Sequence, residues 1–280
     1  MNLKPRPKTL RSQAGFTIAE MMIYLILALI VVTSICQLLI SQNRFYQKQA
    51  GLQDVRNSLR AAANFLAFEL RQTSASGGDI YDMSSSGITI RSVRGVGIVC
   101  GVHGSAPRFG LYSTRGTISA SSEDSAMVYA TSSGEWTISQ IKDTWTTGGG
   151  VDTCDWPGSV ASDITLEVDT ATSDGVSVGA PIRAFKRVEY GMYQDDNRWW
   201  LGRKVGSASS YDKLIGPLLS PTDSGLYLVY HDQAGNVTSD SSQVAYVDII
   251  LRGESQEKVP GAGGPEYQAD TLTLRVALRG

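Results

Sequence analysis

The chain of 280 residues is poor in histidine, in cysteine and in charged side chains. Its two histidines, His103 and His231, are too few for a histidine-rich metal centre, and no Cys-x-x-Cys pair suggests a zinc or thiol-exchange site. Lysine and arginine number 25 against 27 aspartates and glutamates, so the basic excess that neutralises nucleic-acid phosphates is missing. We therefore expect no nucleic-acid partner and no resident cofactor or metal ion.

The N-terminal residues instead suggest a membrane helix. Residues 1–15 are basic and contain no acid, whereas residues 16–40 are apolar except for Glu20. An apolar run of this length can cross a bilayer as a helix, with the basic leader on the cytoplasmic side. No small-residue cleavage site follows the run, which distinguishes it from an ordinary secretory signal. A carboxylate in such a run costs about 2.5–3.5 kcal/mol. Glu20 therefore either has a charged partner or reaches water at the interface.

Residues 41–73 continue this helix as an amphipathic segment. Apolar side chains recur at steps of three and four, which places them on one face of a helix. They are Leu52, Val55, Leu59, Ala62, Leu66 and Leu70. The charged side chains fall off this stripe, and they are Arg56, Arg60, Glu69 and Arg71.

Beyond residue 74 the hydrophobic pattern changes to a period of two, which indicates strands. Turn residues at 193–198 and 230–236 suggest two hairpin turns. The sequence therefore predicts an α+β body, in which the amphipathic half of the helix packs on a mainly antiparallel sheet. The expected strands are 88–93, 126–130, 136–141, 164–168, 183–193, 198–204, 226–230, 244–251 and 271–279.

The junction Gly15-Phe16-Thr17-Ile18-Ala19-Glu20, between the basic leader and the apolar run, resembles the prepilin-type processing site. The resemblance implies a type IV pilin-like protein that is cut between Gly15 and Phe16 by a membrane-embedded prepilin peptidase. Phe16 would then be N-methylated, and Glu20 would be the fifth mature residue. A physical role for Glu20 follows, because its carboxylate can pair with the new terminal amine of a neighbouring subunit.

Several C-terminal runs are similar to PilW-like minor pilins, and also to the J-type minor pseudopilins of type II secretion. Both resemblances imply a cleaved leader (1–15), a transmembrane and filament-core helix (16–40), an amphipathic continuation (41–73) and a β-rich pilin head (74–280). Residues 100–172 have no counterpart in either. The runs are Val188–Tyr190, Trp200–Arg203, Gly216–Leu219, Leu226–Tyr230, Tyr246–Leu251 and Thr273–Arg279.

The function implied is that of a minor pilin without enzymatic activity, which helps to prime assembly of a type IV pilus at or near its tip. The alternative is a minor pseudopilin of a type II secretion or DNA-uptake system. The expected partners are the prepilin peptidase, the inner-membrane assembly platform, other minor pilins and the major pilin. We expect a single-pass protein of the bacterial inner membrane with a periplasmic head, which later enters the filament at the cell surface.

The three cysteines divide between the membrane and the head. Cys36 falls within the apolar run, whereas Cys100 and Cys154 fall beyond it, in what would be an oxidising compartment. A disulfide between Cys100 and Cys154 is favoured there over two free thiols.

The remaining motifs are weaker. Gly175-Val-Ser-Val-Gly179 fits the hydrolase pattern, so a membrane-tethered hydrolase using Ser177 with His103 or His231 is a remote alternative. Calcium ligands could come from the turns that contain Asp195, Asp196, Asp232 and Asn236, although no EF-hand spacing is present.

Overall fold

The computed structural model describes residues 17–103, 106–120, 124–156, 158, 160–169, 175–261 and 263–279. The expected cleavage site, Gly15 and Phe16, lies outside these residues. The chain separates into two compact units. The first contains Met1–Ala50 and Val259–Glu266, and the second contains Gly51–Lys258 and Tyr267–Gly280.

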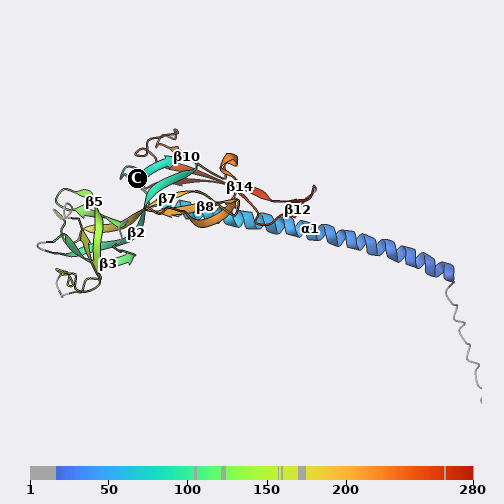
Figure 1. The fold of residues 1–280 in the computed structure, drawn as a ribbon, viewed down its shortest axis with the longest axis horizontal. Helices are drawn as coiled ribbons and strands as arrows, with labels where there is room; N and C mark the ends of the chain where they lie inside the picture. Colours follow the sequence, from blue (N-terminus) through green and yellow to red (C-terminus); the bar gives the residue numbers. More distant parts are fainter. Residues whose placement is uncertain are drawn as a thin grey trace, which may run out of the picture. The chain divides into compact units, whose positions relative to one another are not determined.

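One continuous helix, α1 (Ile18–Arg71), connects the apolar segment to the head (Figure 1). It extends for 54 residues, since no proline occurs between Pro7 and Pro107 to interrupt it. It ends before the Ser- and Gly-rich residues 74–78, where Gly78 adopts a positive φ of 71°. The predicted membrane-spanning and amphipathic segments are therefore parts of a single helix.

In the first unit, α1 is accompanied by a short hairpin of β12 (Val259–Pro260) and β13 (Pro265–Glu266). The Lys48 ammonium lies 3.9 Å from the Glu266 carboxylate, which links the hairpin to the helix. The helix hydroxyls are satisfied locally. Thr33 Oγ1 donates to the Leu29 carbonyl at 2.9 Å, and Ser34 Oγ donates to the Ile30 carbonyl at 2.8 Å. These two hydroxyl groups can therefore enter an apolar environment already paired.

In the second unit, the C-terminal part of α1 packs against an antiparallel sheet and forms the first core. Residues Val55, Leu59, Ala62, Leu66 and Leu70 of the predicted stripe are buried, while Leu52 is half-buried. The α+β fold that the sequence predicts is confirmed. The strands of this sheet are β1 (Ile80–Ser84), β2 (Gly87–Val102), β7 (Pro181–Asp195), β8 (Arg198–Val205), β9 (Asp212–Leu218), β10 (Leu226–His231), β11 (Tyr246–Glu254) and β14 (Ala269–Ala277).

A second core lies inside a closed barrel (Figure 1, green strands). The described strands pair in the circuit β2–β3–β6–β5–β4–β7, and β7 pairs with β2 to close it. All these pairs are antiparallel, and apolar side chains such as Phe109 and Leu166 fill the interior. The strands added here are β3 (Arg108–Gly116), β4 (Asp124–Ala130), β5 (Glu135–Trp145) and β6 (Ile164–Val168).

Strands β2 and β7 are shared by the two cores. They pair from Gly87↔Gly191 to Ile98↔Pro181. Ile90 of β2 contributes to the core beneath the helix, whereas Val99 of the same strand contributes to the barrel core. Residues 100–172, which have no counterpart in the resemblances above, therefore supply most of the barrel.

The structure corrects two parts of the sequence analysis. Each of the nine expected strands is present, β6 with the expected ends and the others with shifted ends, but β1, β3, β9 and the short hairpin were not predicted. In addition, Glu69 does not fall off the apolar stripe. It is 8% exposed and accepts a hydrogen bond from the Ser92 hydroxyl. Glu69 lies seven residues after Ala62, and that spacing returns a side chain to nearly the same face of a helix.

Candidate functional site

The first turn of α1 carries the residue that the processing motif singles out. The Thr17 hydroxyl accepts a hydrogen bond from the Glu20 backbone N–H at 3.3 Å, so Thr17 caps the helix. No described residue forms an ion pair with the Glu20 carboxylate. Its charge is therefore available to a group outside this described chain.

Residues 18–40 of α1 expose apolar side chains around the whole helix. Large hydrophobic residues from Ile18 to Ile40 are more than half exposed, and this helix is long and apolar enough to cross a membrane. A helix that is apolar on every side has to be covered by lipid or by other helices. The segment therefore fits a membrane anchor that can also pack against identical or related helices.

At one end of the barrel, Cys100 and Cys154 form the predicted disulfide, with their Cα atoms 4.8 Å apart. Cys100 lies on β2, and Cys154 lies in the connection between β5 and β6. The connection is also held by backbone hydrogen bonds, since the Asp155 N–H donates to the Cys100 carbonyl at 2.7 Å. Val151 of the same connection packs so closely that a Cβ at Gly101 would lie 2.6 Å from its Cγ1 atom. The described part of the connection is therefore attached to β2 of the barrel.

The calcium candidates belong to two separate turns, one after β7 and one after β10. Asp195 ends β7 and Asp196 lies in the β7–β8 turn, and the Asp195 carboxylate accepts a hydrogen bond from Lys213 Nζ at 2.8 Å. The Asp232 carboxylate accepts hydrogen bonds from the Asn236 N–H at 2.8 Å and from its side-chain amide at 3.3 Å, which hold the Asp232 pKa below its usual value. Among the described residues, no group of three or more His, Cys, Asp or Glu side chains is arranged to hold a metal ion.

Two of the hydrolase candidates, Ser177 and His231, have different partners, while His103 directly follows β2. The Ser177 hydroxyl pairs with the Thr131 hydroxyl, 2.6 Å away, in the turn before β7. The His231 ring, on β10, lies 3.0 Å from the Asp248 carboxylate on β11. Arg275 of β14 donates to the same carboxylate at 2.6 Å, and its guanidinium lowers the Asp248 pKa. The Asp248 group therefore joins three strands, and its partners do not include Ser177.

One pocket was not predicted from the sequence. It has a volume of about 230 Å³ and lies between the end of α1, the barrel and the C-terminal residues. We call it the arginine pocket, after the lining residues Arg91, Arg183 and Arg279, which stand beside Trp136. The arginines are far apart in the sequence, and each alone reads as an ordinary polar position on a strand or chain end. Only the pairing of β2 with β7 brings the first two together.

No family model, curated protein or solved structure matches the chain. Three features of the described residues carry the arguments below: the exposed apolar helix with Glu20, the barrel with its disulfide, and the arginine pocket.

Proposed function

We propose that the chain is a minor pilin, a structural subunit that is made as a membrane-anchored precursor and then enters a type IV pilus at or near its tip. The single observation that carries the proposal is the placement of the Gly15-Phe16 junction directly before α1. The residues of α1 that follow it are uncovered and apolar, while its C-terminal part packs into a folded head.

Cleavage after Gly15 would leave a positive amine on Phe16 at the start of an apolar helix. In a bundle of such helices the amine is buried, and a buried charge is tolerable only when it is paired. Glu20 supplies a carboxylate that has no partner among the described residues. Pairing between the amine of one subunit and the Glu20 of its neighbour would also fix the axial stagger of the two helices.

The location follows from the same features. The basic leader would keep the N-terminus in the cytoplasm, which places the head in the periplasm, and a disulfide persists in such an oxidising compartment. The proposed partners are the prepilin peptidase, the inner-membrane assembly platform, other minor pilins and the major pilin. The additional barrel favours a position near the tip, because a subunit there has fewer neighbours to clash with an enlarged head.

Mass spectrometry of the mature protein tests the proposal. In a host with prepilin peptidase, the chain should begin at Phe16 and carry one methyl group, and Gly15→Val should retain all 15 leader residues. Gly263→Val is the matched control, because a Cβ at Gly263 meets nothing within 4 Å. A protein that still begins at Met1 would contradict the proposal.

A pseudopilin of a type II secretion or DNA-uptake system would use the same anchor, and the C-terminal runs are similar to both classes. Deletion of the gene in its own host separates them. A minor pilin is needed for surface pili, whereas a pseudopilin is needed for secretion or for uptake of DNA while pili persist.

A further inference from the structure

The arginine pocket lies where the two cores meet. Gln72 at the end of α1 and residues 74–79 form one wall. Arg91 of β2, Arg183 of β7 and Trp136 of β5 form the opposite wall, and Arg279 approaches from the C-terminal residues. The Arg279 backbone N–H donates to the Thr73 carbonyl at 2.9 Å, which holds the chain end against the end of the helix.

The charges that line this pocket do not balance. Among the described residues, three guanidinium groups line it together with one carboxylate, that of Asp79. Both Asp79 oxygens are already engaged, because Oδ1 lies 3.3 Å from Arg91 Nη1 and Oδ2 accepts a hydrogen bond from the Ser74 N–H at 2.8 Å. Asp79 therefore neutralises Arg91, and the described lining residues keep an excess of two positive charges, on Arg183 and Arg279.

Arg183, which carries part of this excess positive charge, is half-buried. Its guanidinium lies 5.1 Å from the centre of the Trp136 ring. Within the described residues it makes no hydrogen bond or ion pair. Burial and the nearby charge of Arg279 lower the Arg183 pKa, an effect that Asp79 only partly offsets. The two guanidinium groups thus repel one another across a small recess.

Arg91 is held rigidly, unlike a solvated surface arginine. Its guanidinium stacks between the rings of Tyr81, at 5.2 Å, and Phe185, at 5.3 Å. It also donates to the Tyr81 hydroxyl at 3.1 Å and to the Gly77 carbonyl at 3.2 Å. A fixed cation with fixed hydrogen-bonding neighbours is a preorganised wall, and preorganisation reduces the entropy that a ligand must lose on binding.

We propose that the arginine pocket binds a small oxyanion with two negative charges, held between Arg183 and Arg279 with Arg91 and Asp79 as its fixed frame. Guanidinium groups pair bidentately with phosphate and carboxylate oxygens, so a phosphate group and a small dicarboxylate share the chemistry that this pocket recognises. The volume of about 230 Å³ limits the ligand to one small molecule. The bound anion would remove the repulsion between the two arginines. This site does not depend on the proposed function in pilus assembly.

Isothermal titration of the full chain in detergent micelles tests the site, with inorganic phosphate and malonate as separate probes at pH 7.5 and constant ionic strength. We expect saturable one-to-one binding of at least one probe, and which one binds identifies the oxyanion. Arg279→Gln and Arg183→Gln should each weaken binding at least tenfold. Arg115→Gln removes an exposed arginine that does not line the pocket and should leave the affinity unchanged.

Arg279 is exposed, so its substitution should not disturb the fold, and a circular-dichroism melt of each variant checks this. Absence of saturable binding with both probes would overturn the proposal. Equal weakening by Arg115→Gln would also overturn it, because binding would then reflect net charge alone. Unchanged affinity of a folded Arg279→Gln variant for the probe would also overturn the proposal.

Discussion

The Glu69 carboxylate, near the end of α1, accepts a hydrogen bond from the hydroxyl of Ser92 on β2. Both residues are buried, so a charged group ties the helix to the sheet inside the first core. Burial and the Glu69 charge together raise the pKa of the neighbouring Tyr190 hydroxyl. A buried carboxylate of this kind stabilises the fold only while its donors remain in place.

Ser92→Ala should destabilise the head by about 1–3 kcal/mol, because it removes a donor from a buried carboxylate without removing the charge. Urea unfolding of the detergent-solubilised chain, followed by tryptophan fluorescence, measures the change. Ser133→Ala, at an exposed serine in the β4–β5 turn, is the matched control and should change the free energy of unfolding by less than about 0.5 kcal/mol. Equal stability of the two variants would show that the hydrogen bond contributes nothing.

The head should lose stability in alkali because of two buried tyrosines. Burial raises the pKa of Tyr230, and burial together with the Glu69 charge raises that of Tyr190. The folded chain therefore keeps protons that the unfolded chain releases above about pH 10. Stability is complete below that pH and falls as the pH rises further, by up to about 1.4 kcal/mol per pH unit for each tyrosine.

Unfolding free energies at pH 9, 10 and 11 test this dependence. Tyr190→Phe should flatten the decline, whereas Tyr227→Phe, at a side chain that is 42% exposed, should not. Tyr230→Phe should also flatten it, at the cost of the hydrogen bonds that the Tyr230 hydroxyl donates to the Ser84 and Gly87 carbonyls, each at 3.0 Å. A decline that is the same in all three variants would contradict the assignment.

The sequence was sufficient for features that depend on local periodicity. The helix and the alternation of Leu272, Leu274 and Val276 in β14 could be read directly, because each pattern repeats along one element. Glu69 was misplaced for a different reason. Its spacing of seven from Ala62 puts it on the buried face, but its charge suggested solvent, and the partner that makes burial tolerable, Ser92, lies 23 residues away.

Features that depend on long-range strand pairing could not be predicted from the sequence. The strands β3 and β9 contain Gly110 and Pro217, which obscure the alternation. Closure of the barrel requires β2 to pair with β7, and nothing in either strand specifies the other. The arginine pocket depends on that same pairing. By contrast, the disulfide was predictable, because Cys100 and Cys154 are the two cysteines beyond the apolar run.

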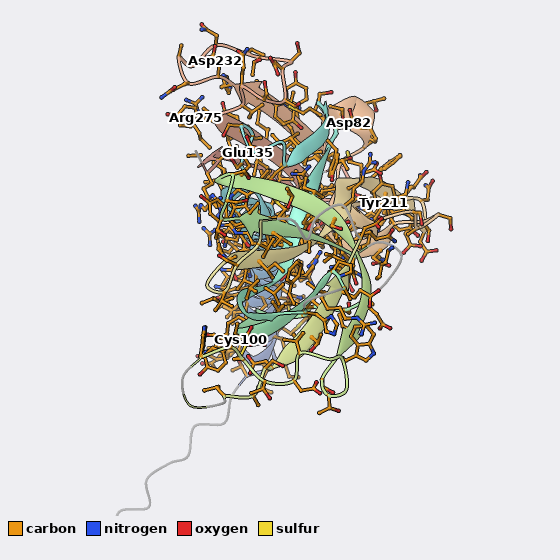
Figure 2. All side chains as sticks on the ribbon, turned by 90° about the vertical axis from the view of Figure 1, so that its left-hand side faces the viewer. Asp82, Cys100, Glu135, Tyr211, Asp232 and Arg275 are labelled. Carbon is orange, nitrogen blue, oxygen red and sulfur yellow. A yellow bond between two sulfur atoms is a disulfide. The ribbon has the colours of Figure 1, made fainter. Side chains whose placement is uncertain are left out.

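Gly202→Ala should destabilise the outer face of the sheet. Gly202 of β8 pairs with Gly191 of β7, and the ring of Tyr211, labelled in Figure 2, lies close to both. A Cβ at Gly202 would lie 2.9 Å from the Tyr193 Cβ and 3.0 Å from the Tyr211 Cβ, so both side chains would have to move.

Overpacking of this kind costs about 1–3 kcal/mol, and thermal unfolding measures it. Gly263→Ala is the control, because the added methyl group would meet open space. The additional variant Gly202→Ala/Tyr211→Ala removes the Tyr211 ring, whose Cδ1 atom would lie 3.0 Å from the added Cβ, and should recover part of the loss. If Gly202→Ala alone is as stable as the control, the close packing of Tyr211 against the two glycines is contradicted.

Loss of the disulfide should destabilise the barrel. The bond closes a loop with a sequence separation of 54 residues, which the chain-entropy model values at about 4 kcal/mol. Cys100→Ser/Cys154→Ser should lower the melting temperature and make residues 146–163 sensitive to protease, whereas Cys36→Ser, in the apolar helix, should do neither. In Figure 2, Cys100 and Asp232 are labelled at opposite ends of the view, so cleavage near Asp232 should not increase. Labelling of both cysteines by a thiol reagent without reduction would reject the bond.

Glu20→Val should permit membrane insertion and still block assembly. The substitution removes a charge that costs about 2.5–3.5 kcal/mol to insert. In the proposed filament it would also leave the Phe16 amine of a neighbouring subunit without a counter-charge, and breaking a buried pair costs about 3–5 kcal/mol. Incorporation into filaments should therefore fall by at least tenfold.

Leader removal and incorporation are measured in the same cells, so that a failure of processing is not mistaken for a failure of assembly. Glu20→Asp should retain part of the incorporation because the charge remains, and Glu135→Val, at an exposed position in the head, should have no effect. Normal incorporation of Glu20→Val would show that the carboxylate only reaches water at the membrane interface and does not pair within the filament.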